Sequence, residues 1–153
     1  MRFRLLLVLM AIDKTRLSEV VRSAGKSLTK QRCLIIERLA ANKLPMSAYE
    51  LRDQIKITEQ NLNISTVYRV LDFWIGLGLI HKIESANRFM VCSDEHQHQF
   101  HVIQFCTRCE NVRESCELAS QTKMQRSHEF RALENQVIEI KGICLDCQAN
   151  TST

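Results

Sequence analysis

Residues 65–75 read STVYRVLDFWI, a stretch that predicts an amphipathic helix. Large apolar residues recur at helical spacing and form the face that is expected to be buried: Val67, Val70, Leu71 and Trp74. The opposite face carries side chains that form hydrogen bonds: Thr66, Tyr68, Arg69 and Asp72. Ser65 or Thr66 is expected to cap the first turn of this helix, and Gly76 is expected to end it.

The residues on either side of this stretch predict further helices before it and a β-hairpin after it. Helices are expected at residues 13–24, from 29 to about 41 and from 47 onwards, and strands at residues 79–84 and 88–92. Thr29 is the expected cap of the second helix, and Ser47 and Glu50 have the spacing of a capping box at the third. Helices followed by a hairpin are typical of a winged helix-turn-helix domain.

Two Cys-x-x-Cys pairs flank the C-terminal half of the chain. Each pair can present two thiolates from one tight turn, and two such turns complete the tetrahedral four-sulfur shell that structural zinc prefers. We therefore predict a structural zinc site with these ligands: Cys106, Cys109, Cys144 and Cys147. Two disulfides and unpaired core cysteines are the alternatives, and an odd total of seven cysteines makes a disulfide framework the poorer one.

Changes in composition divide the chain into three parts. We expect a winged-helix domain at residues 1–92, a polar, histidine-rich hinge at residues 93–100 and an α/β domain at residues 101–153. In the last part, strands are expected at residues 101–105, 111–115 and 137–143, with a helix at residues 118–126. The predicted fold class is therefore α+β, with the four-cysteine zinc site in the C-terminal domain.

Positive charge is concentrated in the first part of the chain. Residues 1–85 carry 14 Lys and Arg against 8 Asp and Glu, a net of +6, whereas residues 86–153 carry 7 against 9, a net of −2. The basic part is the candidate for binding a polyanion. Residues 1–12 include a short apolar run without a small-residue cleavage site, so we read them as a helix extension or an early start codon, with Met10 as a plausible start. We expect a cytoplasmic protein with no membrane partner.

The helix at residues 65–75 is the candidate reader of DNA. A recognition helix needs one buried face for docking and polar side chains on the other face that reach into the major groove. Arg69 is suited to a guanine edge or a phosphate, and Tyr68 to a phosphate. Lys56 is a further candidate for contact with the backbone. The predicted DNA-binding residues are Tyr49, Thr66, Tyr68 and Arg69, and the alternative is an ordinary solvated helix face.

A second set of possible metal ligands gathers around the hinge. Its members offer nitrogen, sulfur and oxygen donors: His81, Cys92, His96, His98, His101 and Glu114. A two-residue turn at Ala86 and Asn87 would place His81 directly opposite Cys92, whereas a loop one residue longer would make them diagonal neighbours on opposite faces. One thiolate with imidazoles and a carboxylate suits zinc better than magnesium or manganese. The alternative is a set of surface histidines with a buried cysteine.

Six stretches carry a resemblance to a known family. They are LTKQR at residues 28–32, SAYEL at 47–51, STVYRVLD at 65–72, GLIHKIES at 78–85, CTRC at 106–109 and GICLDC at 142–147. With these motifs the chain resembles the ferric uptake regulator family, and most closely its zinc uptake regulator branch. The resemblance covers roughly residues 13 to 148.

The resemblance implies a winged-helix DNA-binding domain, a hinge and an α/β dimerisation domain. It also implies a homodimer that binds palindromic operators in double-stranded DNA when loaded with zinc, and that represses zinc-import genes. Two zinc ions per chain are implied, one structural and one regulatory. The regulatory ligands carried over are His81, Cys92, His98 and Glu114, with His96 or His101 as alternates for His98 because the spacing to Cys106 is irregular for the family.

Other functions are less well supported by the sequence. An iron- or peroxide-responsive regulator of the same family is the runner-up, and the Cys92 thiolate argues against it. A zinc hydrolase would need an open coordination position, which four protein ligands do not leave. A zinc-stabilised interaction protein without a sensing role would hold one tightly bound ion. We therefore expect no catalytic residues and no small-molecule substrate.

Overall fold

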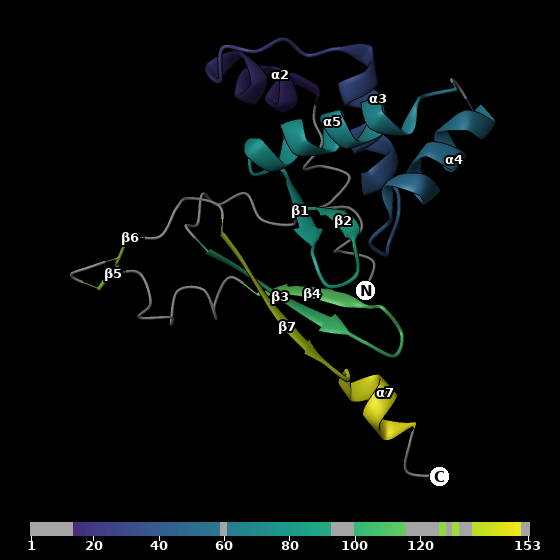
Figure 1. Ribbon diagram of the computed structural model, residues 1–153, viewed down its shortest axis with the longest axis vertical. Coiled ribbons are helices and arrows are strands. Elements are labelled where there is room, and N and C mark those ends of the chain that lie inside the picture. The colour runs from purple at the N-terminus through teal and green to yellow at the C-terminus, as the bar shows by residue number, and fades with distance from the viewer. Residues whose placement is uncertain are drawn as a thin grey trace. The chain divides into compact units, whose positions relative to one another are not determined.

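The protein is described by a computed structural model that places residues 14–58, 61–92, 100–115, 126–127, 130–131 and 136–150 (Figure 1). The chain divides into two compact units, residues 1–93 and 94–153. Within the described residues, helices are confined to the first unit except for one short helix near the C-terminus, and both units contain strands. In this part of the chain, no helix has the length and apolar character needed to cross a membrane.

The first unit is a winged helix-turn-helix, as predicted. Its helices and strands follow one another in this order: α2 (Lys14–Ser23), α3 (Lys30–Ala40), α4 (Ala48–Thr58), α5 (Ile64–Gly76), β1 (Ile80–Ile83) and β2 (Arg88–Val91). The two strands pair antiparallel and form the wing. An isolated antiparallel bridge between Met46 and Phe89 joins the segment before α4 to the wing.

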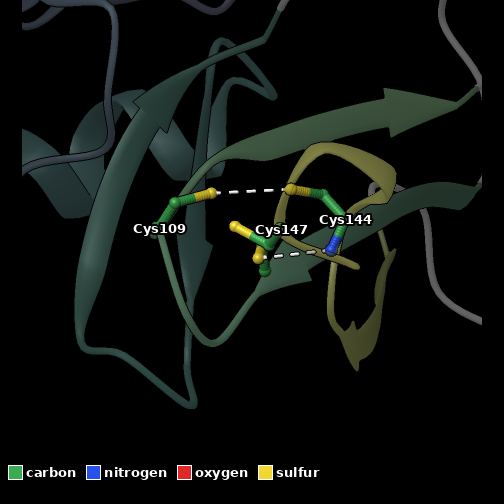
Figure 2. A group of neighbouring side chains, drawn as sticks. Cys109, Cys144 and Cys147 are labelled. Carbon is green, nitrogen blue, oxygen red and sulfur yellow. Dashed lines mark hydrogen bonds between the residues drawn. The ribbon is translucent and has the colours of Figure 1, made fainter. Parts of the chain in front are cut away.

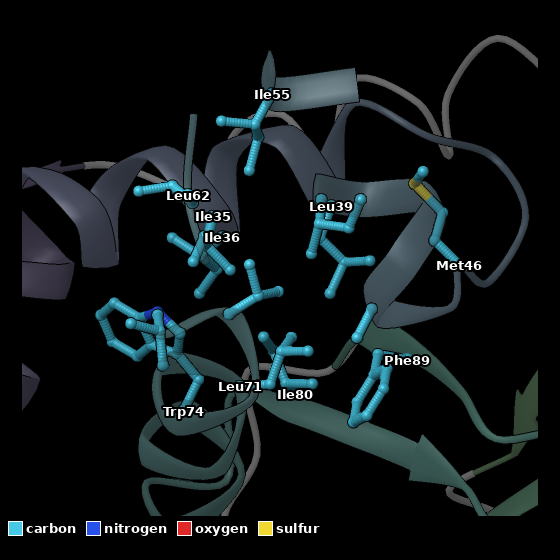
Figure 3. Close-up of a cluster of buried hydrophobic side chains, with 14 of the residues drawn as sticks. Ile35, Ile36, Leu39, Met46, Ile55, Leu62, Leu71, Trp74, Ile80 and Phe89 are labelled. Atoms are coloured by element: carbon cyan, nitrogen blue, oxygen red, sulfur yellow. The ribbon is translucent and has the colours of Figure 1, made fainter. Parts of the chain in front are cut away.

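The apolar stripe of α5 is buried in the core of the first unit (Figure 3). Val67, Leu71 and Trp74 have no exposed surface, as their helical spacing predicted. The indole Nε1 of Trp74 donates a hydrogen bond of 3.1 Å to the carbonyl of Arg32, so the single polar atom of this side chain is satisfied inside the core. Helix α5 is therefore fixed on its inner face, and its other face is presented outward.

The predicted caps are confirmed for two helices and wrong for the third. The Thr29 hydroxyl accepts a hydrogen bond from the Arg32 N–H at 3.3 Å, and Ser47 with Glu50 forms the capping box of α4. Helix α5 is capped by Asn63 instead of Ser65 or Thr66, because the Asn63 side chain accepts from the Ser65 N–H at 3.1 Å. Asparagine is among the strongest capping residues, and it precedes the two hydroxyl side chains.

The register of the wing differs from the predicted one. Ile83 pairs with Arg88, so the loop has four residues, 84–87, and the two-residue turn is wrong. Asn87 has a φ of 49°, in the left-handed region that asparagine tolerates, and this closes the longer loop. His81 consequently pairs with Met90, and Cys92, two residues further on, is its diagonal neighbour on the same face.

The second unit is built on a three-stranded sheet in the order β4-β3-β7. Strand β3 (Phe100–Cys106) pairs antiparallel with β4 (Val112–Ser115) and parallel with β7 (Gln136–Gly142). Two short elements were not predicted: the hairpin of β5 (Arg126–Ser127) with β6 (Phe130–Arg131), and helix α7 (Leu145–Ala149). Of the helix expected at residues 118–126, residues 118–125 lie outside the described part, and Arg126 belongs to a strand.

Candidate metal centres and nucleic-acid interface

The parallel pairing of β3 and β7 brings the two Cys-x-x-Cys pairs together. Cys106 at the end of β3 pairs with Gly142 at the end of β7, so the residues that follow both strands lie at one edge of the sheet. Cys144 then stands at the N-terminus of α7, and Cys147 lies within that helix. All four sulfur atoms, of Cys106, Cys109, Cys144 and Cys147, lie within 4.8 Å of one another. This is the cluster that the spacing predicted.

Hydrogen bonds hold the two cysteine turns together around this cluster (Figure 2). The Cys109 and Cys144 sulfurs are 3.6 Å apart, and the backbone N–H of Cys144 donates to the Cys106 sulfur at 3.3 Å. Outside the cluster, Arg108 Nη1 donates to the carbonyl of Cys147 at 2.8 Å. These contacts link the turn that carries Cys106 and Cys109 to the turn that carries Cys144 and Cys147.

Hydrogen bonds among the four cysteines shift the pKa values of their thiols in opposite directions. Hydrogen bonds from the backbone N–H groups of Cys144 and Cys109 lower the pKa of Cys106 to about 6. Hydrogen bonding with the side chains of Cys144 and Cys109 raises the pKa of Cys147 to about 12. The thiols therefore do not all ionise on their own at neutral pH, whereas a divalent ion stabilises four thiolates together. No cysteine in the described residues forms a disulfide, and four sulfurs at this spacing fit structural zinc.

The wing of the first unit carries a buried histidine and a buried cysteine. His81 on β1 exposes 2% of its surface, and Cys92, just after β2, exposes 8%. Their ligand atoms lie within 4.8 Å of each other. The Cys92 N–H donates to the carbonyl of Leu79 at 3.0 Å, which extends the pairing of the strands and fixes the thiol on the His81 face. A thiol and an imidazole placed together in this way are a suitable pair of zinc ligands.

The second unit carries its own buried pair of potential ligands. His101 on β3 and Glu114 on β4 are diagonal neighbours on one face of the sheet, since Glu114 pairs with Ile103. The His101 Nδ1 and a Glu114 carboxylate oxygen are 2.9 Å apart, and their side chains expose 2% and 1% of their surface. His96 and His98 lie outside the described residues. Among the three candidate histidines of the hinge region, only His101 has a described position.

The candidate DNA-facing side chains lie on α4 and α5. Arg69 is exposed, while Thr66 and Tyr68 are half-buried. The Tyr68 ring packs edge-on against Phe89 with ring centroids 6.3 Å apart, so Tyr68 also belongs to the rim of the core. On α4, Tyr49 is 54% exposed.

Arg52 is an additional basic residue on this surface that sequence reasoning missed. Its guanidinium lies 5.4 Å from the centre of the Tyr49 ring and forms an ion pair with Asp53 at 2.6 Å. The available signal was a basic residue three positions after Tyr49 on the same helix. Lys56, one turn further along, is exposed as well. Tyr49, Arg52 and Lys56 thus follow one another at helical spacing along one face of α4.

Comparison with known proteins identifies the family. The model of the ferric uptake regulator family matches residues 23–140. The zinc uptake regulation protein of Escherichia coli (strain K12) is 31% identical over 147 residues, covering 89% of this chain and 85% of that protein. That of Mycobacterium tuberculosis (strain CDC 1551 / Oshkosh) is 29% identical over 130 residues, covering 83% and 98%.

A solved structure supports the same relationship. A zinc uptake regulator complexed with zinc and DNA has a TM-score of 0.76 at 29% identity, and the match covers 91% of this chain and 95% of that one. The family match, residues 23–140, spans more than half of the sequence. The chain therefore belongs to the ferric uptake regulator family.

Proposed function

We propose that this protein is a zinc-dependent repressor that binds operators of zinc-uptake genes as a homodimer. The observation that carries the proposal is the buried His81 and Cys92 pair on the wing of a winged-helix domain. A buried thiol beside a buried imidazole is a donor pair that suits zinc. The similarity to a zinc uptake regulator solved with zinc and DNA supports the proposal.

The regulatory ion is proposed to be held by ligands from both units: His81 and Cys92 from the first, His101 and Glu114 from the second. The buried contact between His101 and Glu114 favours His101 over His98 as the histidine ligand, and His98 and His96 remain the alternatives. One thiolate, two imidazoles and one carboxylate form a donor set that zinc accepts. The same set argues against an iron- or peroxide-responsive regulator. With the structural ion at the four cysteines, each chain binds two zinc ions.

The wing and the sheet of the second unit would respond to zinc through these ligands. A bound ion supplies positive charge that allows the Cys92 thiolate and the Glu114 carboxylate to remain buried. Ligation then ties β1 and β2 of the wing to β3 and β4 across the hinge at residues 93–100. Zinc would favour the arrangement of the protein that binds DNA. Bound DNA must therefore raise the affinity for zinc by the same factor by which zinc raises the affinity for DNA.

The remaining parts of the proposal concern partners and location. The domain of residues 101–153 forms the homodimer, and each protomer reads one half of a palindromic site through α5 and α4. The reading residues are Arg69, Thr66, Tyr68 and Tyr49. We place the protein in the cytoplasm, and we assign it no catalytic activity, because four protein ligands leave no open coordination position at either site.

A mobility-shift titration of a palindromic promoter fragment at buffered free zinc tests this function. We expect the affinity to rise with free zinc, and Cys92→Ser to abolish that rise while thermal unfolding stays cooperative. Cys33→Ser is the matched control, because Cys33 is a partly buried cysteine of α3 that belongs to neither group of proposed ligands. Equal affinity before and after removal of the exchangeable ion would contradict the sensor function.

A further inference from the structure

One arginine of the wing contacts the start of helix α4. Arg88, the first residue of β2, donates from Nη1 to the carbonyl of Pro45 at 2.9 Å and to Glu50 Oε2 at 3.0 Å. The Arg88 side chain is only 22% exposed, so its charge is partly shielded from water. An arginine that neutralises a carboxylate inside its own domain is poorly placed to serve as a free phosphate contact.

The Glu50 oxygen that accepts from Arg88 is also the oxygen of the capping box. Glu50 Oε2 accepts from the Ser47 N–H at 2.7 Å and from the Ser47 hydroxyl at 2.9 Å. One carboxylate oxygen therefore caps the start of helix α4 and holds the wing at the same time. A shift of the wing must either break this arrangement or carry the first turn of α4 with it.

Backbone contacts next to this pair reinforce the connection. Phe89 N–H donates to the Met46 carbonyl at 2.7 Å, and Met46 N–H donates back to the Phe89 carbonyl at 3.0 Å. The wing end of the connection carries the ligand pair His81 and Cys92. The helix end carries Tyr49, the residue directly before Glu50, exposed on the candidate DNA-facing surface.

We propose that Arg88 is a positioning residue. Its contact with Glu50 fixes the start of helix α4 relative to the wing that carries His81 and Cys92. Zinc ligation fixes the wing, and the pair of Arg88 and Glu50 fixes the Tyr49 end of α4 to that wing. Loss of the pair leaves zinc binding intact but weakens the effect of zinc on DNA affinity. This inference rests on the proposed function.

The test is the dissociation constant for the promoter fragment at saturating and at depleted free zinc, measured over a series of salt concentrations. The proteins are wild type, Arg88→Met, Glu50→Gln, the double variant and Arg88→Lys. Glutamine keeps the capping-box acceptor and removes only the charge. Arg22→Met is the matched control, because it removes one positive charge from an exposed position at the end of α2.

The positioning role predicts that Arg88→Met and Glu50→Gln each reduce the zinc-dependent gain in affinity by about tenfold, a typical coupling between sites. The double variant should be no worse than either single one, Arg88→Lys should recover part of the gain, and Arg22→Met should resemble wild type. Zinc affinity without DNA and the salt slope should stay unchanged. If Arg88→Met does not fold, the zinc-dependent gain in affinity of Glu50→Gln and Arg88→Lys is compared with that of wild type.

Three results would overturn the inference, and they can be told apart. If wild type itself shows no zinc-dependent gain, the proposed function fails and the inference falls with it. If wild type shows the gain and Glu50→Gln keeps all of it, the function stands and the positioning role is wrong. If Arg88→Met is the one variant that weakens DNA binding, and the slope of log affinity against log salt concentration falls in magnitude by about 0.9, Arg88 contacts a phosphate directly.

Discussion

The Nδ1 atom of His101 lies 2.9 Å from a carboxylate oxygen of Glu114, and both side chains are almost fully buried. A polar pair in such a position is costly unless all of its hydrogen-bonding groups are used. The contact engages Nδ1, and Nε2 is the atom on the other side of the ring that we propose as the metal donor. This geometry suits a histidine that binds a metal through Nε2. The Glu114 carboxylate then either orients the imidazole ring or binds the same ion.

His101→Asn is expected to remove the exchangeable zinc. Asparagine has no imidazole nitrogen, so the proposed site loses one of its four ligands. His96→Asn and His98→Asn should bind zinc as wild type does. Competition with a chromophoric zinc chelator gives the three affinities. A loss confined to His98→Asn would instead assign the ligand role to that residue.

Metal analysis is expected to find two zinc ions per chain that differ in exchange. A mild chelator should remove only the ion held by His81, Cys92 and their partners, and operator binding should be lost with it. The ion of the four-cysteine cluster should leave only when the second unit unfolds, since such sites contribute about 10–16 kcal/mol of apparent binding energy. Elemental analysis before and after dialysis, with circular dichroism, distinguishes the two. A single, non-exchangeable ion would favour a zinc-stabilised interaction protein.

Arg69→Ala should weaken operator binding by about 1–3 kcal/mol without affecting stability. Arg69 is exposed on α5, outside the core stripe that fixes the helix. Asp72→Ala, one turn away on the same exposed face, is the control for general effects on the helix. Fluorescence anisotropy with operator and scrambled DNA provides the measurement. Equal losses on both DNAs would indicate a phosphate contact instead of base reading.

The acid sensitivity of the first unit should depend on Glu50. The Ser47 backbone N–H, followed by the Ser47 hydroxyl and Arg88, holds the pKa of Glu50 below its ordinary value of 4.5. A carboxyl with a lowered pKa stabilises the folded state above its ordinary pKa, and the stabilisation is lost as pH falls through the folded pKa. Glu50→Gln should thus be less stable than wild type at about pH 6, and the difference should shrink below pH 4.5. Urea unfolding of both proteins at several pH values measures the difference in their free energy of unfolding. A difference that does not change with pH would show that the Glu50 charge does not stabilise the first unit.

The sequence predicted those features that depend on local periodicity and spacing. The α5 stripe from Val67 to Trp74 is buried because its apolar residues recur once per helical turn, whatever packs against them. The four-cysteine cluster followed from the same kind of regularity. The Ser47 and Glu50 capping box is likewise a local interaction, with both partners in one turn.

Features that depend on tertiary contacts were beyond the sequence. The wing loop was predicted too short because residues 85–87 carry no strong two-residue turn signal, and the closing Asn87 has a positive φ. Arg88 and Glu50 lie 38 residues apart, and nothing in either segment marks them as partners. The register of β3 against β4 places His101 beside Glu114, and the sequence alone did not contain this relationship.

Strand β3 is parallel to β7, and all of residues 107–135 lie between them in the chain. On the ribosome, β3 emerges first and has no parallel partner until β7 follows, and closing so long a connection is slow. Cys106 and Cys109 form only half of a coordination shell during that interval. The proposed structural zinc site is therefore complete only after residues 136–147 have been synthesised, because Cys144 and Cys147 supply its other two sulfurs.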